Sequence, residues 1–589
     1  MKLCKKAAAA AAAVFCLSLC GGCLYIQKPP QQDFDAFVES LPQELIADSD
    51  YSLNLLYKDP QAAGFSQDVL YELPFTSIEE YTEAPEDDLL ERLEAYPYNT
   101  LTEKQKLTYD ILKDYFKRRD LPEELIALDN NYLGSFIGFQ AELPLLLNEY
   151  EINSRHDLES YFHMLDTSKE TFKNYYENEL ERQELGVGLT KSSLEGAIEQ
   201  AKKFSSDTDC FLIDAVNEKI DKADFLNEKE KAEAKIQNAQ SVKTLLEAYA
   251  QLAEDLSTIE TERDGGLCTV PNGKEYYSYL LKADAGVDMT PEEVSSFLAE
   301  QKESCLQDFI RFIGEHPEIA ESLDSFDRDA VQYCDFESAE ENIAYFQSVI
   351  SGRFPELPNL TYKVQQVPAS MADNFSPAAY ISAPVDAGSD VVESIYLNGE
   401  YDQSLFSTIA HEGYPGHMYQ DAYFRSLELP DIHSLLSYTG YTEGWAVYVE
   451  QQILEEVPGD RVMAQFLWYN DMIMNICLCQ ADVGIHYEGW SRDDLLTFLS
   501  QEFSGLTREA TDEIYDLIAE NPVYYQHYFL SGLLFMEMRE QAEDALGGAF
   551  DETEYHEIVL GSGPAPLSYV QQRVEAYIQN AGEAGKAAA

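Results

Sequence analysis

The sequence predicts a mainly α-helical fold with one small β-sheet, and three patterns support this prediction. Between residues 33 and about 260, apolar residues recur at the spacing of amphipathic helices. Residues 362–367 and 394–398 alternate as strands do, and residues 380–384 between them are expected to be extended. Residues 463–487 are strongly apolar and predict a buried helix. A small sheet is therefore expected late in an otherwise helical chain.

The first residues have the features of a bacterial lipoprotein signal. Three lysines precede an apolar run over residues 7–20, which is shorter than the roughly 20 residues that a membrane-spanning helix needs. Gly21-Gly22-Cys23 resembles a lipoprotein box, although Cys20 stands where leucine is usual. We therefore predict a signal peptide over residues 1–22, followed by a lipidated Cys23 and a short tether to residue 34. A plain secreted protein and a retained N-terminal anchor are the alternatives.

One large helical domain is expected over residues 35–580, with a candidate sub-boundary near residues 260–290, because no long linker rich in proline, glycine or serine interrupts it. The chain has 40 basic and 107 acidic residues, a formal charge of −67. This charge argues against nucleic acid and anionic lipid surfaces as partners, so the membrane is expected to be contacted through the N-terminal lipid only. A solubilising surface explains the charge better than attraction of cationic peptides. Six cysteines follow Cys23, too sparse to predict a disulfide framework.

The heptapeptide from His411 to His417 carries the strongest chemical signal. Two imidazoles can hold a zinc ion, and the carboxylate of Glu412 beside the first can act as general base toward its water. In the familiar H-E-x-x-H signature both histidines share one helix face, whereas here they are six residues apart, about 240° on a continuous helix. Pro415 and Gly416 predict a helix break that would let both rings reach one ion. The alternative is two ordinary polar residues on either side of a kink.

A carboxylate on a following helix would complete a site with two histidine ligands. Glu443 opens such a segment 26 residues beyond His417, and Glu450 follows two helical turns later on the same face. We predict Glu443 as the third zinc ligand. Glu450 is a candidate for orienting a ligand through a hydrogen bond, and a solvated helix carboxylate is the equal alternative.

Together these motifs resemble the bacterial family known as domain of unknown function 885. The resemblance lies in residues 411–417 and 443–450 and extends to residues 267–281, 482–490 and 561–578, so it covers most of the mature chain. It implies a mostly helical fold with a deep cleft, similar to the glutamate-zincin metallopeptidases such as Taq-type carboxypeptidases and angiotensin-converting enzyme. The small sheet would then lie next to the metal-binding helix. The substrates of the family are poorly defined.

Zinc peptidases need a donor to the oxyanion of the tetrahedral intermediate, and tyrosine or histidine on a late helix commonly supplies it. The aromatic stretch near the end of the chain offers Tyr524, Tyr525, His527 and Tyr528. Tyr528 best fits the tyrosine position of the family and is predicted in this role.

Three further side chains are weaker candidates for substrate contacts. Arg539 could hold a substrate carboxylate, although a structural ion pair is the favoured alternative. His486 could line the cleft, and a satisfied structural histidine is its alternative. Asn398, at the end of an expected strand, could contact a peptide that adds to the sheet edge, and a turn beside Gly399 is the alternative.

The combined prediction is a lipid-anchored, extracytoplasmic zinc metallopeptidase with Zn²⁺ as cofactor. Its substrates would be short peptides, because a helical cleft excludes folded chains. The sequence does not distinguish an exopeptidase from an endopeptidase, and it does not indicate an oligomeric state. One rival is a non-catalytic surface lipoprotein that binds peptides or wall material, and another is a zinc amidase or esterase acting on a non-peptide substrate. Glu412 favours an enzyme, since a binding module needs no base beside a metal ligand.

Overall fold

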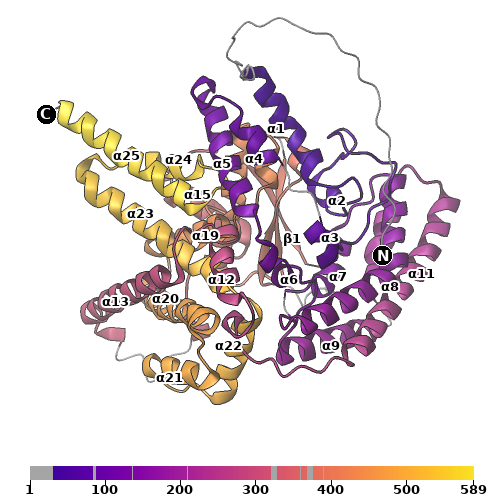
Figure 1. The fold of residues 1–589 in the computed structure, drawn as a ribbon. Helices are drawn as coiled ribbons and strands as arrows, with labels where there is room; N and C mark the ends of the chain where they lie inside the picture. The colour runs from indigo at the N-terminus through magenta and orange to yellow at the C-terminus, as the bar shows by residue number, and fades with distance from the viewer. Residues whose placement is uncertain are drawn as a thin grey trace, which may run out of the picture.

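The computed structural model describes residues 31–83, 88–135, 137–207, 210–319, 328–357, 360–367, 376–388 and 391–588. Helices dominate these residues and pack around two large hydrophobic cores, with one small sheet in the described chain (Figure 1). The prediction of a mainly helical fold with a small sheet is therefore confirmed. The predicted signal peptide and Cys23 lie outside the described residues. The end of the predicted tether is helical instead, because the first helix begins at Gln31 and already buries Phe34.

Helices of the first half lie together in the ribbon (Figure 1), and buried side chains between residues 53 and 256 form a core of their own. Helix α8 shows why the amphipathic pattern predicted the helices of this half. Its inner face carries Leu158, Tyr161 and Leu165, which are all buried. The helices of this half are α1 (Gln31–Leu45), α2 (Leu53–Leu56), α3 (Ile78–Glu83), α4 (Leu89–Glu94), α5 (Glu103–Arg119), α6 (Ile126–Asp129), α7 (Phe139–Glu149), α8 (Arg155–Glu184), α9 (Lys191–Ser205), α10 (Phe211–Lys222) and α11 (Glu228–Leu256).

The second half supplies most of the other large core, which α1, α4 and α5 complete from the first half. The predicted apolar helix is α20, which ends at Val483 and continues as a π-helical turn over Gly484–Glu488. A second π-helical turn, Gln526–Leu530, leads into α23. The helices are α12 (Gly273–Ala283), α13 (Pro291–Glu315), α15 (Ala339–Val349), α16 (Phe406–Glu412), α17 (His417–Ser426), α18 (Ile432–Leu435), α19 (Thr439–Ile453), α20 (Arg461–Val483), α21 (Arg492–Glu502), α22 (Arg508–Glu520), α23 (Ser531–Leu546), α24 (Glu552–Leu560) and α25 (Leu567–Ala588). Among the described helices, none is both long and apolar enough to cross a bilayer.

The sheet has three strands in the order β1-β3-β2. Strand β1 (Thr361–Gln366) runs parallel to β3 (Val392–Leu397), and β2 (Ala378–Ile381) runs antiparallel to β3. All three segments were expected to be extended, although β2 stops at Ile381 and a 3-10 turn follows at Val385–Ala387. Ile395 of β3 packs in one small core with Phe406 and Ile409 of α16. The sheet therefore lies against the helix that carries His411, with β2 as an edge strand.

Candidate metal centre

The predicted helix break is present and depends on Gly416. Helix α16 ends at Glu412, and α17 begins at His417. A Cβ atom on Gly416 would lie 1.8 Å from the carbonyl oxygen of His411, so no larger residue fits without moving the backbone. The N–H of Gly416 donates to the carbonyl oxygen of Ala410 over 2.9 Å. This turn brings the rings of His411 and His417 to a centroid distance of 4.7 Å, nearly perpendicular to each other.

Helix α19 is fixed against the break from the other side of the site. Trp445 is fully buried and donates its indole N–H to the carbonyl oxygen of Pro415 over 2.9 Å, in the turn whose Tyr414–Pro415 peptide bond is cis. Gly444 lets α19 approach α23 closely, since a Cβ atom there would lie only 2.6 Å from Cβ of Ser531. Glu443, which precedes this glycine, is thereby positioned next to the two histidines.

The three predicted ligand residues come together with spacing that suits a metal. Oε2 of Glu443 lies 3.4 Å from Nε2 of His411 and 3.4 Å from Nε2 of His417, and one donor atom of each residue lies within 4.8 Å of the others. A tetrahedral zinc ion with ligands at about 2.0–2.1 Å separates neighbouring donor atoms by about 3.3 Å. Both distances from Glu443 to the histidines match this value and exceed the roughly 2.7–2.9 Å of a charge-assisted hydrogen bond. Among the described residues, the buried Oε2 of Glu443 has no hydrogen-bond partner.

Glu450 lies where it can orient His411. Its Oε1 accepts a hydrogen bond from Nδ1 of His411 over 2.7 Å, which leaves Nε2 of this histidine directed toward Glu443. Burial disfavours the charged form of His411, yet Glu443 and Glu450 raise its pKa well above the usual range. Burial also raises the pKa of Glu443, but the two imidazoles outweigh burial and lower it to about 2. The two carboxylates thus favour a positive charge at this place.

Glu412 is held beside these residues by the edge strand. Its Oε2 accepts a hydrogen bond from the backbone N–H of Tyr380 in β2 over 2.8 Å. The hydroxyl of Tyr380 in turn donates to Oδ2 of Asp421 over 2.5 Å, and Arg425 pairs with Asp421 and with Glu393. These contacts connect strand β2 with α16 and α17 around Glu412, the carboxylate that was predicted to act as base.

A cavity of about 1090 Å³ opens onto the site. His411, Glu412, His417 and Glu443 line it, and Tyr528 lines it as well. Of the four predicted candidates for oxyanion donor, only Tyr528 belongs to this lining. Burial and the charge of Glu443 raise the pKa of Tyr528, so its phenol keeps its proton at neutral pH and can donate it in a hydrogen bond.

Comparison with known proteins now identifies the family. The family described as "Bacterial protein of unknown function (DUF885)" matches residues 64–574. The chain belongs to this family. The resemblance drawn from the sequence motifs is thereby confirmed as far as the family itself, and no curated protein matches the chain significantly.

Two solved structures are similar in fold to this DUF885 member. One, described as a candidate lipoprotein from Colwellia psychrerythraea, is 19% identical with a TM-score of 0.76, and the match covers 93% of this chain and 99% of that one. The other, described as a candidate lipoprotein of unknown function from Shewanella oneidensis, is 17% identical with a TM-score of 0.58, covering 92% and 98%. At these identities the likeness shows a shared fold.

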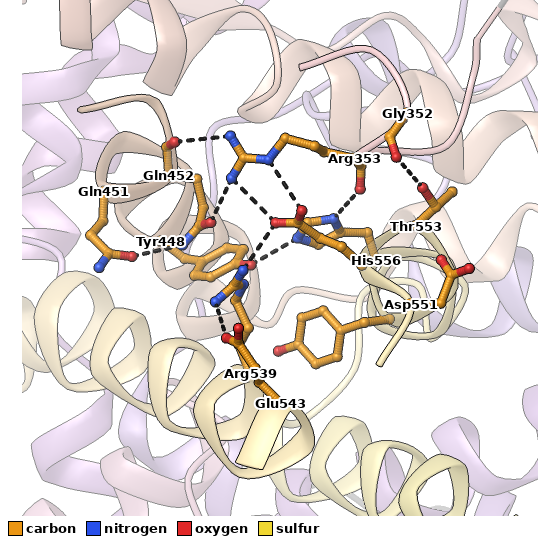
Figure 2. Close-up of polar contacts among 12 residues, drawn as sticks. Gly352, Arg353, Tyr448, Gln451, Gln452, Arg539, Glu543, Asp551, Thr553 and His556 are labelled. Atoms are coloured by element: carbon orange, nitrogen blue, oxygen red, sulfur yellow. Dashed lines mark hydrogen bonds and ion pairs between the residues drawn. The ribbon is translucent and has the colours of Figure 1, made fainter. Parts of the chain in front are cut away.

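Arg539 lies away from the cavity lining of this DUF885 protein. It forms ion pairs with Glu543 and Glu552, and Glu552 is shared with Arg353 (Figure 2). In the same cluster Tyr448 of α19 is hydrogen-bonded to Nε2 of His556 over 2.8 Å. The cluster therefore stabilises the part of α19 near Tyr448. Arg539 forms structural ion pairs, which was the favoured alternative to a contact with a substrate carboxylate.

His486 and Asn398, the other two weaker candidates, and His527 also lie outside the lining of the cavity. Nδ1 of His486 accepts from the backbone N–H of Leu267, and its Nε2 donates to the carbonyl oxygen of Ile518, so this buried histidine is satisfied by backbone. Nε2 of His527 lies 3.1 Å from Oδ2 of Asp284. Asn398 directly follows β3 beside Gly399, which has a φ of 96°, and its backbone N–H donates to Pro377. The contacts of His486 account for this residue without a substrate, whereas the substrate roles of His527 and Asn398 stay predictions.

Sequence reasoning missed Tyr380, Asp421 and Arg425, which all line the cavity. A signal for two of them was present, because His417, Asp421 and Arg425 are spaced by four residues along α17 and so share one helix face. Tyr380 holds Glu412 through its backbone N–H, and the identity of a residue does not reveal a backbone contact of this kind. All six cysteines among the described residues are free in the structure.

Proposed function

We propose that this protein is a zinc-dependent metallopeptidase that hydrolyses short peptides outside the cytoplasm, where an N-terminal lipid anchors it. One observation carries the proposal: two imidazoles and a carboxylate stand at ligand spacing while Glu412, a possible base, is held beside them in the same cavity. Two histidines and one carboxylate are a donor set that zinc accepts while leaving a fourth position free. The lipid anchor is supported by Gly21-Gly22-Cys23 and by the lipoprotein descriptions of the two similar structures.

Each residue has a role in this mechanism. His411, His417 and Glu443 would hold the zinc, which when bound polarises a carbonyl and lowers the pKa of water toward neutrality. Glu412 would take the proton from the attacking water and pass it to the leaving amine. The hydrogen bond from Tyr380 fixes one oxygen of Glu412, so the other remains for this task.

Tyr528 and the strand edge would complete the reaction. The phenol of Tyr528 would donate a hydrogen bond to the oxygen that becomes negative as the carbonyl is attacked. Strand β2 is an edge strand of the described sheet, so an extended peptide could add to its outer edge through backbone groups other than the Tyr380 N–H, which already donates to Glu412. Such backbone binding would place a peptide along the cavity with little dependence on its sequence.

The test compares the wild type with Glu412→Gln on a mixed library of short peptides, with zinc content measured in parallel. We expect cleavage that a chelator abolishes and zinc restores, and a fall in rate of about 10²–10⁴-fold in Glu412→Gln without loss of zinc. Glu400→Gln, at an exposed carboxylate before α16, is the matched control and should behave as wild type.

Other outcomes would separate the rivals. Bound zinc without any chelator-sensitive cleavage of peptides would point to a non-catalytic binding lipoprotein. Chelator-sensitive hydrolysis confined to non-peptide amides or esters would point to the amidase or esterase alternative. Failure of the protein to bind zinc would refute both the peptidase and the amidase or esterase.

A further inference from the structure

One part of the cavity carries a group of aliphatic side chains. Leu45, Ile46, Leu55, Leu56 and Leu435 line it with partly exposed aliphatic side chains. Leu436 and Phe424 extend the same lining. We refer to the first five residues with Leu436 as the aliphatic wall. Partly open apolar surface within a cavity that also holds convergent polar groups is typical of a ligand-binding site.

The aliphatic wall is fixed on both sides. Helix α1, which ends at Leu45, packs against α18, which ends at Leu435. Beyond α2 the backbone N–H groups of Lys58 and Asp59 donate to the two carboxylate oxygens of Asp386 over 2.7 and 2.8 Å. Asp386 lies in the 3-10 turn that follows β2. The wall is thus connected to the strand whose Tyr380 holds Glu412, and it is in place before any ligand binds.

The wall also contrasts with the charged side of the cavity. There Arg425 pairs with Asp421 and Glu393, so its positive charge is compensated within the protein.

Four of the six wall residues precede residue 64, where the family match begins. Family membership therefore carries no statement about them, and the specificity of this part of the cavity has to be inferred from its own chemistry.

We propose that the aliphatic wall is a specificity subsite, which takes an aliphatic side chain of the peptide whose carbonyl lies at the metal centre. This proposal rests on the proposed function and names its substrate class: short peptides with a leucine-like residue near the cleaved bond. The wall and the metal-ligand residues line one continuous cavity, so one bound peptide can contact both. A charged or amide side chain would lose hydration against these six aliphatic side chains, which offer it no hydrogen bond.

The experiment measures binding of peptide hydroxamates to the zinc-loaded protein. The probes form pairs that differ in one side chain, leucine or glutamine, placed on either side of the hydroxamate. We expect wild type to bind at least one leucine probe about tenfold more tightly than its glutamine partner, and Leu55→Asn to reduce that ratio at least about fivefold. Ile236→Asn, at an aliphatic residue of α11 that is 62% exposed, should leave the ratio unchanged.

A second variant covers the case in which Leu55→Asn does not fold. Asp386→Asn removes the charged acceptor that anchors the wall but alters no wall residue, and it should reduce the same ratio by a smaller factor. Equal binding of leucine and glutamine probes, or an unchanged preference in folded, zinc-loaded variants, would overturn the subsite while leaving the peptidase proposal intact. Binding of no hydroxamate at all would overturn both.

Discussion

Replacing Gly416 by alanine should destroy the metal site without touching a ligand. The added Cβ would lie 1.8 Å from the carbonyl oxygen of His411 and 2.4 Å from that of Ala410. Cβ contacts below 3.0 Å are essentially never found. The turn must therefore open by about 1.2 Å, the difference between this limit and the 1.8 Å to the His411 oxygen. Gly416 directly precedes His417, so the ring of this histidine moves with the backbone.

That displacement is large compared with what zinc tolerates. Ligand distances are held within about 0.2 Å, and weakening even an orienting hydrogen bond typically costs 10–100-fold in affinity. Loss of a whole ligand should therefore lower zinc affinity at least about 100-fold, or about 2.7 kcal/mol.

A chelator competition titration measures this loss directly. The control is Gly314→Ala in α13, where an added Cβ meets no atom within 4 Å; it should bind zinc as wild type does and unfold no more easily. Stabilisation against heat by added zinc should be present in the control and strongly reduced in Gly416→Ala. If Gly416→Ala folds and binds zinc as tightly as wild type, the argument that this turn holds His417 in the site is wrong.

Two further predictions follow from individual hydrogen bonds. Glu450→Gln should lower zinc affinity about 10–100-fold in the same titration, because it weakens the contact that orients His411; unchanged affinity would make Glu450 a bystander. Burial lowers the pKa of His486 to about 4, below its unfolded-state value of about 6.5. The free energy of unfolding contributed by neutral His486 is therefore fully present above about pH 6.5. It is lost as the pH falls toward 4, with about 1 kcal/mol lost by pH 5.5. Urea unfolding at pH 7.5 and 5.5 should therefore show a smaller pH-dependent loss in His486→Asn than in wild type, and an equal loss would contradict a neutral buried His486.

The sequence was informative where local backbone chemistry decides the structure. Leu158, Tyr161 and Leu165 follow the period of a helix, and they are buried on one face of α8. The alternation in residues 362–367 gave β1 to within one residue at each end. The break at Gly416 was foreseeable as well, because proline and glycine act on their own backbone and need no distant partner.

Contacts between distant segments could not be foreseen in this way. The position of Glu443 relative to the histidines depends on how closely α19 approaches α23, which is decided by Gly444 packing on Ser531, 87 residues away in sequence. The support of Glu412 comes from a backbone N–H, which every residue except proline carries. His486 shows the opposite error: a histidine in a family motif was considered for the cavity, whereas its two ring nitrogens are occupied by backbone groups.

This difference explains why the chemistry was easier to anticipate than the specificity. A metal site needs a few donor types at short sequence spacing, and the pairs His411–His417 and Glu443–Glu450 carry that information within about 40 residues. A subsite needs only apolar surface at the right place, and leucines occur throughout the chain. Leu55 and Leu56 have no sequence feature that separates them from core residues; only the packing of α1 against α18 and the anchor at Asp386 leave them facing the cavity. Substrate preference in this protein should therefore respond to changes in the 45–59 segment that leave zinc binding untouched.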